Sequence, residues 1–378
     1  MSELTDEQRA IQEMTREFAA KEIAPYAADW NANHAPSVDV MRRMGELGLL
    51  GMVVPEADGG PGLDSVTLAL VTEELAAVDA GTCVSFAVQN GLAVDPLINH
   101  ANEGQRRTWL PRLVSGEVLG AYGLTEPDAG SDVASLRTRA VRDGDGYVVT
   151  GSKIWISNGG FADMFILFAR TGEDGPRGIS AFIAPAGPGL VVGRELEKMG
   201  LHSSSTVELA FDGYRVPAEN MIGEEGAGMT IALETLDAGR ITVAAQACGI
   251  ARAAIDVACS YARERTAFGG PIGRFQGVQF PIADASAKLE AARALTLMAA
   301  RARDRGEPHS VIGAQAKLVA SSVAVEAADV AVQTLGGMGY SREFVAERLY
   351  RDAKITQIYE GTSQIQRLVI ARSLLGRL

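Results

Sequence analysis

The sequence of 378 residues predicts an α+β fold in three consecutive parts: an N-terminal helical domain, a small antiparallel β barrel or sandwich, and a C-terminal four-helix bundle. Three observations support this order. Apolar residues recur at helical spacing in the first part, short alternating runs bounded by turn residues make up the second, and alanine-rich helical stretches dominate the third. Strands and helices do not alternate, which excludes a doubly wound sheet. We place the domains at residues 1–118, 119–225 and 226–378.

The N-terminal domain begins with a capping signal. Thr5 and Gln8 have the spacing of a capping box, and apolar residues follow at helical spacing until Pro25. We predict a second amphipathic helix over residues 37–48 and, after a glycine-rich turn, a third over residues 65–78. These helices are expected to form the first layer of the protein.

The middle domain is predicted from turn signals between short apolar runs. The segment Asp143–Gly146 separates two alternating stretches and has the pattern of a β-hairpin turn. The predicted strands cover residues 136–141, 147–156, 164–169, 178–183 and 207–211.

The C-terminal domain has the pattern of long packed helices. Ile250, Ala254, Val257 and Tyr261 fall on one helical face. Glycine and proline breaks then divide the region into about four helices and a terminal one, as expected for a bundle. These breaks lie at residues 269–271, 306–308 and 336–339.

Composition excludes several classes of protein. The longest stretch without a charged residue, Gly178–Gly193, contains two prolines and is shorter than the ~18 apolar residues that a membrane span needs. The N-terminus lacks the basic start and apolar run of a secretory signal, so we expect a cytoplasmic protein. The three cysteines are widely separated, and the four histidines form no zinc-binding pattern.

The charge is unevenly distributed along the chain. The net charge of −12 argues against nucleic-acid binding. Residues 1–225 carry −16 and residues 226–378 carry +4, so the C-terminal part is better suited to hold an anion.

Two glycine-rich runs stand out, although dinucleotide-fold, P-loop and hydrolase-elbow motifs are missing. In the run Tyr122–Asp132, Gly130 and Ser131 could cradle a phosphate, although a plain turn is the simpler reading. In the run Lys153–Gly160, Trp155 and Ser157 would lie on one side of a strand, where they could contact a flat heterocycle or pack in a core.

Two further runs, Arg263–Gly269 and Ile358–Arg367, complete a resemblance to the acyl-CoA dehydrogenase family that extends over nearly the whole chain in order. The resemblance implies noncovalently bound FAD and a homotetramer. It also implies fatty acid metabolism by α,β-dehydrogenation of an acyl-CoA thioester, with electrons passed to an electron-transfer flavoprotein.

The resemblance also assigns binding residues. The matched substrate-binding positions are Ser131, Asp237, Arg240, Tyr359 and Gly361. Some FAD contacts, at Arg265, Thr266, Phe268 and Gln276, would come from a neighbouring subunit. All matched FAD-binding positions are Tyr122, Leu124, Thr125, Gly130, Ser131, Trp155, Ile156, Ser157, Arg265, Thr266, Phe268, Gln276, Gln333, Gly336, Gly337, Thr362, Ser363 and Gln364.

Glu360 is similar to the family's catalytic base. A carboxylate between Tyr359 and Gly361 could lie in a dry pocket that raises its pKa toward the value a base needs. Without the resemblance, a glutamate near a helix start would be interpreted as an exposed charge stabilised by the helix dipole. Some relatives carry the base on an earlier bundle helix, but the matching residue here is Gly239, which has no acidic group. At His202 the family commonly has arginine, so an ion pair made there would be missing or pH-dependent, or the histidine has no role.

Two other functions stay open at this point. A same-fold flavin oxidase or dehydrogenase could act on a carrier-bound or unusual acyl group, and oxygen reactivity would distinguish it. A non-catalytic scaffold could bind acyl-CoA or FAD without turnover, although Glu360, Trp155 and Ser157 argue against this. The run Leu236–Ile241 resembles short-chain members and predicts a short or branched-short acyl group.

Overall fold

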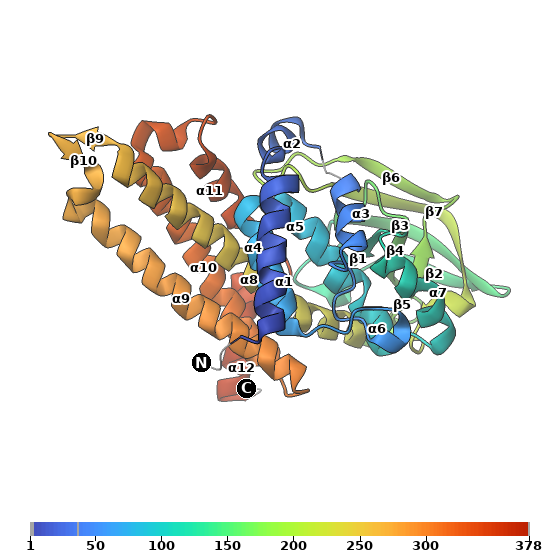
Figure 1. Cartoon of the computed structure of the whole chain (residues 1–378). Coiled ribbons are helices and arrows are strands. Elements are labelled where there is room, and N and C mark those ends of the chain that lie inside the picture. Colours follow the sequence, from blue (N-terminus) through green and yellow to red (C-terminus); the bar gives the residue numbers. More distant parts are fainter. Residues whose placement is uncertain (1–3, 36–37, 377–378) are drawn as a thin grey trace.

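A computed structural model describes residues 4–35 and 38–376, and its three parts follow one another along the chain. Helices come first, a β-sheet domain follows, and long helices complete the molecule (Figure 1). The predicted fold class is therefore confirmed. In Figure 1 the sheet lies at one end of the molecule, the long C-terminal helices lie at the other, and α1, α4 and α5 lie between them.

The described part of the N-terminal domain contains seven α-helices. The predicted capping box is present, because the Thr5 hydroxyl accepts from the Gln8 N–H at 3.1 Å and the Gln8 side chain accepts from the Thr5 N–H at 3.0 Å. Ser37, at the predicted start of the second helix, lies outside the described residues. The helices are α1 (Asp6–Phe18), α2 (Ala27–Asn33), α3 (Val38–Glu46), α4 (Ser65–Val78), α5 (Ala80–Ala87), α6 (Asp95–His100) and α7 (Glu103–Val114), with π-helical turns at Ala19–Ile23 and Val88–Ala93.

The middle domain is one eight-stranded sheet in the order β6-β7-β3-β2-β4-β5-β8, with β1 also paired to β4. Most neighbours are antiparallel as predicted, but β4 runs parallel to β1 and β2. The β2–β3 hairpin lies between β1 and β4 in sequence, so no tight turn forces these two strands to run in opposite directions. The strands are β1 (Gly120–Gly123), β2 (Arg139–Asp143), β3 (Gly146–Ser157), β4 (Met164–Arg170), β5 (Ile179–Pro185), β6 (Leu190–Glu195), β7 (Thr206–Pro217) and β8 (Met221–Ile222).

The first strand of the predicted hairpin begins later than expected. The sequence predicts a strand from Leu136, whereas β2 begins at Arg139. The backbone of the earlier residues is used elsewhere. The Glu126 carboxylate accepts from the N–H groups of residues 137 and 138, and the Leu136 carbonyl accepts from the Arg170 guanidinium. Side chains therefore compete with the sheet for these backbone groups.

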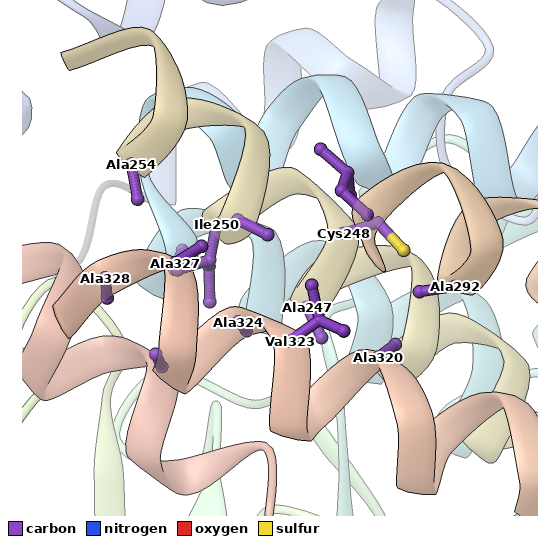
Figure 2. Packing of buried hydrophobic residues seen from close by; sticks show 14 of the residues in the cluster. Ala247, Cys248, Ile250, Ala254, Ala292, Ala320, Val323, Ala324, Ala327 and Ala328 are labelled. Atoms are coloured by element: carbon purple, nitrogen blue, oxygen red, sulfur yellow. The ribbon is translucent and has the colours of Figure 1, made fainter. Parts of the chain in front are cut away.

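Up to residue 376, where the description of the structure ends, the C-terminal domain contains three long helices and two shorter ones. Small residues let α8 and α10 approach closely, with Ala247, Ala320 and Ala324 fully or almost fully buried at their interface (Figure 2). Ile250 and Ala254 are buried on the predicted face of α8. The elements are α8 (Gly228–Glu264), the short strands β9 (Thr266–Ala267) and β10 (Gly270–Pro271), α9 (Gln276–Asp304), α10 (Ser310–Leu335), α11 (Val345–Ile355) and α12 (Ser363–Leu375).

By length and composition alone, α8 and α10 are apolar enough to cross a membrane. In the fold, 78% of the most apolar window of α8 is buried inside the protein, and the corresponding share of α10 is 44%. Both helices contribute buried residues to one hydrophobic cluster. The three cysteines are free thiols. Cys83 and Cys248 are buried, and Cys259 is half-buried.

Candidate active site

Glu360 lies in the turn between α11 and α12 rather than inside a helix. Its φ is +48°, and the following Gly361 has a φ of +88°. A positive φ is uncommon for a residue with a side chain and marks a strained backbone position. Thr362 then caps α12, because its hydroxyl accepts from the Ile365 N–H at 3.3 Å. The turn therefore projects Glu360 away from the helix that follows.

The carboxylate of Glu360 packs against the backbone of α8. A Cβ placed on Gly239 would lie 3.0 Å from Glu360 Cδ and would overlap Oε2. Oε2 is buried and, within the described residues, has no hydrogen-bond partner. Glu360 is thus half-buried with an unsatisfied oxygen, and not the exposed helix-start charge that its sequence position suggests in isolation.

Burial raises the pKa of Glu360 to about 7. The positive charges of Lys317 and Arg240 oppose this rise, and the negative charge of Asp95 adds to it. Asp95 on α6 is held in turn by Arg303, with both carboxylate oxygens 2.8 Å from Nη2. A carboxyl group with a pKa near neutrality can take up and release protons at the pH where most enzymes work.

Four of the five residues predicted to bind substrate, all except Ser131, lie next to Glu360 itself or close to Gly239, which contacts its carboxylate. Asp237 and Arg240 flank Gly239 on α8 and form an ion pair at 2.5 Å. Arg240 Nη1 also donates to Ser310 on α10 at 3.3 Å. The Tyr359 hydroxyl donates to Gln246 of α8. Helix α8 and the Glu360 turn therefore lie side by side at the candidate active site.

The first glycine-rich run forms β1 and a tight turn. The turn is closed by mutual backbone hydrogen bonds between Glu126 and Ala129 at 3.0 and 3.1 Å, so the plain-turn interpretation describes its backbone. Tyr122 and Leu124 are buried, whereas Gly130 and Ser131 are exposed. Burial raises the pKa of Tyr122, and the charge of Glu360 adds to this rise. Tyr122 is therefore within electrostatic reach of the Glu360 carboxylate.

The second run is bonded directly to the first. The Ile154 N–H donates to the Thr125 carbonyl at 3.0 Å. The buried Lys153 ammonium donates to the Leu124 carbonyl at 3.0 Å and to Glu126 at 2.7 Å. These contacts hold the loop after β1 against the end of β3.

Trp155 departs from the regular strand geometry that the sequence predicts. It has a φ of +62° and lies in a register shift between Lys153 and Ile156 against β7. Simple alternation therefore does not place Trp155 and Ser157 on one side, because a bulge reorients the side chain. The indole is 55% exposed, although tryptophan is usually mostly buried. Ile156 is buried and Ser157 is half-buried.

These residues fit a bound flavin. An uncovered indole offers a flat apolar surface, and the neighbouring hydroxyls of Thr125 and Ser157 offer hydrogen bonds to a polar ring edge. A Cβ placed on Gly130 would meet no atom within 4 Å, so the backbone there is open to a ligand. Thr362, Ser363 and Gln364 follow Gly361 and form the cap and first residues of α12. Within the described residues, no group of three or more His, Cys, Asp or Glu could hold a metal ion.

The remaining predicted FAD contacts follow α8 or lie at the end of α10, and those that follow α8 lie far from Glu360 in the same chain. The last residue of α8, Glu264, lies twenty-five residues beyond Gly239, which is about 37 Å at the rise of an α-helix. Arg265 follows directly. One chain therefore does not bring the two groups together. These contacts are all exposed and comprise Arg265, Thr266, Phe268, Gln276, Gln333, Gly336 and Gly337.

Sequence reasoning missed two anchoring residues of the site. Lys317 is a lone charged residue in an apolar part of α10, and it is 1% exposed. Asn158 is buried with a φ of +63°, and its amide donates to the carbonyls of Ser85 and Gly120 at 3.1 and 3.2 Å. A charged residue within an alanine-rich helical face is a signal that could have pointed to Lys317.

His202 lies apart from these residues. Its ring stacks on His34 with centroids 4.1 Å apart, and Nε2 lies 2.9 Å from the Lys198 carbonyl. Partial burial lowers the pKa of His202 below 6.5. Arg351 contributes to this lowering. Where the resemblance leads us to expect an arginine, this chain therefore has an imidazole that is mostly neutral at pH 7.

Comparison with known proteins gives matches over the whole chain. Three family models match in order: "Acyl-CoA dehydrogenase, N-terminal domain" over residues 5–117, the middle domain over 121–214 and the C-terminal domain over 226–375. The mouse mitochondrial short-chain specific acyl-CoA dehydrogenase is 44% identical, with 99% of this chain and 91% of that protein covered.

Solved structures agree with these sequence matches. Butyryl-CoA dehydrogenase from Megasphaera elsdenii superposes with a TM-score of 0.97 at 43% identity, covering 99% of this chain and all of that one. A chain solved in work on the electron transferring flavoprotein of Acidaminococcus fermentans gives a TM-score of 0.98 at 45% identity, with both chains fully covered.

Proposed function

This chain belongs to the acyl-CoA dehydrogenase family, and from that premise we propose that it converts a short acyl-CoA thioester to the trans-2-enoyl-CoA. It is an oxidoreductase of the short-chain type in an FAD-dependent family. The proposal rests mainly on one observation: the half-buried Glu360 carboxylate packs against Gly239. Burial raises the pKa of this carboxyl group to about 7.

Glu360 is the base that removes the α-proton. Its Oε2 has no protein partner within the described residues, so the oxygen is free to accept a proton from a substrate carbon. Burial favours the protonated product of this transfer, which increases the basicity of the carboxylate. The left-handed backbone of residues 360 and 361 gives the carboxylate its direction.

The thioester must be polarised for this step, because its α-proton is too weakly acidic for a carboxylate otherwise. A hydrogen-bond donor at the carbonyl oxygen stabilises the negative charge that develops there. We assign this role to the backbone N–H of Glu360. Within the described residues this N–H donates to no protein acceptor.

The flavin site lies at the loop after β1 and the end of β3. Trp155 would cover one face of the ring system, Thr125 and Ser157 would bond its polar edge, and Ser131 would contact both cofactor and substrate. When bound, FAD supplies the acceptor for the hydrogen that leaves the β-carbon as hydride. Asp237 and Arg240 would hold the substrate beside Gly239.

The assembled enzyme is proposed to be a homotetramer in which neighbouring chains complete each site. The separation of about 37 Å along α8 supports this assignment, because Arg265 and Phe268 cannot reach the cofactor beside Glu360 of their own chain. The phenyl ring of Phe268 is 90% exposed, as expected for a residue that a partner covers.

The electron acceptor is proposed to be an electron-transfer flavoprotein, which the similarity to the Acidaminococcus chain supports. The short acyl chain is supported by the mouse and Megasphaera relatives.

Anaerobic titration tests the proposal. Purified protein is mixed with saturated acyl-CoAs of increasing chain length while bleaching of the flavin absorbance is followed. We expect wild type to bleach fastest with butyryl-CoA and Glu360→Gln to bind FAD without bleaching. Glu326→Gln, on the surface of α10, is the matched control and should behave as wild type. Bound FAD that no acyl-CoA bleaches would contradict the substrate class.

A further inference from the structure

Lys317 on α10 bonds the backbone on both sides of Glu360. Its ammonium donates to the Tyr359 carbonyl at 2.7 Å and to the Gly361 carbonyl at 2.6 Å. These bonds join residues more than forty positions apart in sequence and connect the core of the bundle to the turn. Glu360 is therefore held between two fixed peptide units.

The bond to Tyr359 has a consequence for the next N–H group. The Tyr359 carbonyl and the Glu360 N–H belong to one planar trans peptide, so they point in opposite directions. A cation on the carbonyl therefore turns the N–H away from α10. The cation also polarises the peptide and makes the N–H a stronger donor.

The ammonium group of Lys317 has no carboxylate within ion-pair distance among the described residues. The other fully buried lysine, Lys153, bonds the carboxylate of Glu126 at 2.7 Å. Lys317 instead has two carbonyl acceptors within the described residues. Burial lowers the pKa of Lys317 to about 8, and the charge of Glu360 opposes this lowering while Arg240 adds to it. An ammonium group in such surroundings costs stability, which suggests a role beyond packing.

We propose that Lys317 is a positioning residue for the reaction, which fixes the Glu360 turn so that the carboxylate faces the α-carbon and the Glu360 N–H faces the thioester carbonyl. This inference rests on the proposed role of Glu360. It adds a residue that touches neither substrate nor cofactor and acts through two carbonyl oxygens.

The first experiment uses Lys317→Met in the holoenzyme, with Gln105→Met as the control. Gln105 also donates to two carbonyls, at 2.7 and 2.8 Å, but it lies on α7 among residues with no assigned role in the site. The rate of flavin reduction by butyryl-CoA should fall about 10- to 100-fold in Lys317→Met, because small displacements of a reacting group and weakened oxyanion donors have effects of this size. The Kd for butyryl-CoA should change less than about threefold, because the contacts to bound substrate remain. Gln105→Met should leave both values unchanged.

The second experiment measures how strongly the Glu360 N–H donates a hydrogen bond, and it requires no turnover. In a Glu360→Gln background, binding of acetoacetyl-CoA is measured as a function of pH by the absorbance of its enolate. Adding Lys317→Met should weaken enolate binding by about tenfold while binding of butyryl-CoA is kept. A merely structural role would weaken both equally or neither.

A third variant separates the proposal from a folding defect. Lys317→Ala leaves space beside the two carbonyls, and ethylammonium added to the solution should restore part of the rate of flavin reduction. Ethanol of similar size should not, because it carries no charge. Equal rescue by ethanol, or an enolate affinity unaffected by Lys317→Met, would overturn the proposal. Failure of wild type to be reduced by any acyl-CoA would instead overturn the proposed function.

Discussion

The carboxylate of Glu360 and the backbone of Gly239 lie in direct contact, with no space for a side chain between them. Glycine at position 239 therefore has a steric role as well as lacking an acidic group. The Glu360 carboxylate occupies the space that a side chain at position 239 would fill. A chain with side chains at both positions would have to move one of them.

Gly239→Ala should displace the Glu360 carboxylate and reduce flavin reduction by butyryl-CoA about 10- to 100-fold. The added methyl group is compatible with a helix and stabilises an α-helix by about 0.5–1 kcal/mol relative to glycine, so unfolding should not explain the loss. Gly313→Ala on α10 is the control. There the new Cβ would meet its nearest atom at an ordinary 3.5 Å, and we expect nearly wild-type rates. Equal rates for both variants would exclude the contact as a determinant of activity.

The reductive half-reaction should depend on pH through Glu360. Burial raises the pKa of this group to about 7, and the ionised form is the base. The rate should therefore rise about tenfold per pH unit below 7 and level off above it. Lys317, Arg240 and Asp95 are the neighbouring charged groups, and only Asp95 raises the pKa further. Stopped-flow measurements from pH 5.5 to 9 test this, and a rate independent of pH would exclude Glu360 as the titrating base.

The buried pair Lys153–Glu126 should be important for stability. Lys153→Met leaves the Glu126 carboxylate buried without its cation and should reduce the free energy of unfolding by about 3–5 kcal/mol. Glu126→Gln in the same chain should recover part of this loss, because it removes the unpaired charge. Urea unfolding followed by fluorescence and circular dichroism measures both variants. A loss below about 1 kcal/mol would mean that water or another group replaces the lysine.

Sites shared between chains can be tested by complementation. Glu360→Gln and Arg265→Ala each remove one half of a proposed site, so oligomers of either single variant should be nearly inactive. In mixed oligomers, a chain with Glu360 can pair with a partner that retains Arg265. In a pair of chains that carry one variant each, one shared site has both substitutions and the other has neither. Mixed oligomers should therefore reach up to half of the wild-type rate. No restoration in purified mixed oligomers would indicate that each chain builds its site alone.

The order of domains and the main helices could be predicted because their signals are local. Thr5 and Gln8 cap a helix three residues apart, and α4 is bounded as its pattern predicts. The late start of β2 could not be predicted in this way. It depends on the Glu126 carboxylate and the Arg170 guanidinium, which come from other elements.

The candidate site likewise has features that the sequence could predict and features that it could not. Glu360, Trp155 and Ser157 were identified from a resemblance over ordered motifs, and their roles stay predictions. The positive φ of Trp155 and the bonds of Lys317 depend on contacts between distant segments. Local periodicity contains no information on such contacts, because the same alanine-rich helix could face solvent or a turn.

Helix α8 carries Gly239 in its first third and leads into Arg265 at its C-terminal end, with no break over 37 residues. An uninterrupted α-helix is a stiff spacer of about 55 Å, and inserting one residue would turn everything beyond it by about 100°. If Gly239 and Arg265 belong to two different cofactor sites, as proposed, an insertion between them in α8 would misalign both sites at once. On the proposal that neighbouring chains share their cofactor sites, the length of α8 would set the separation between the two sites to which one chain contributes.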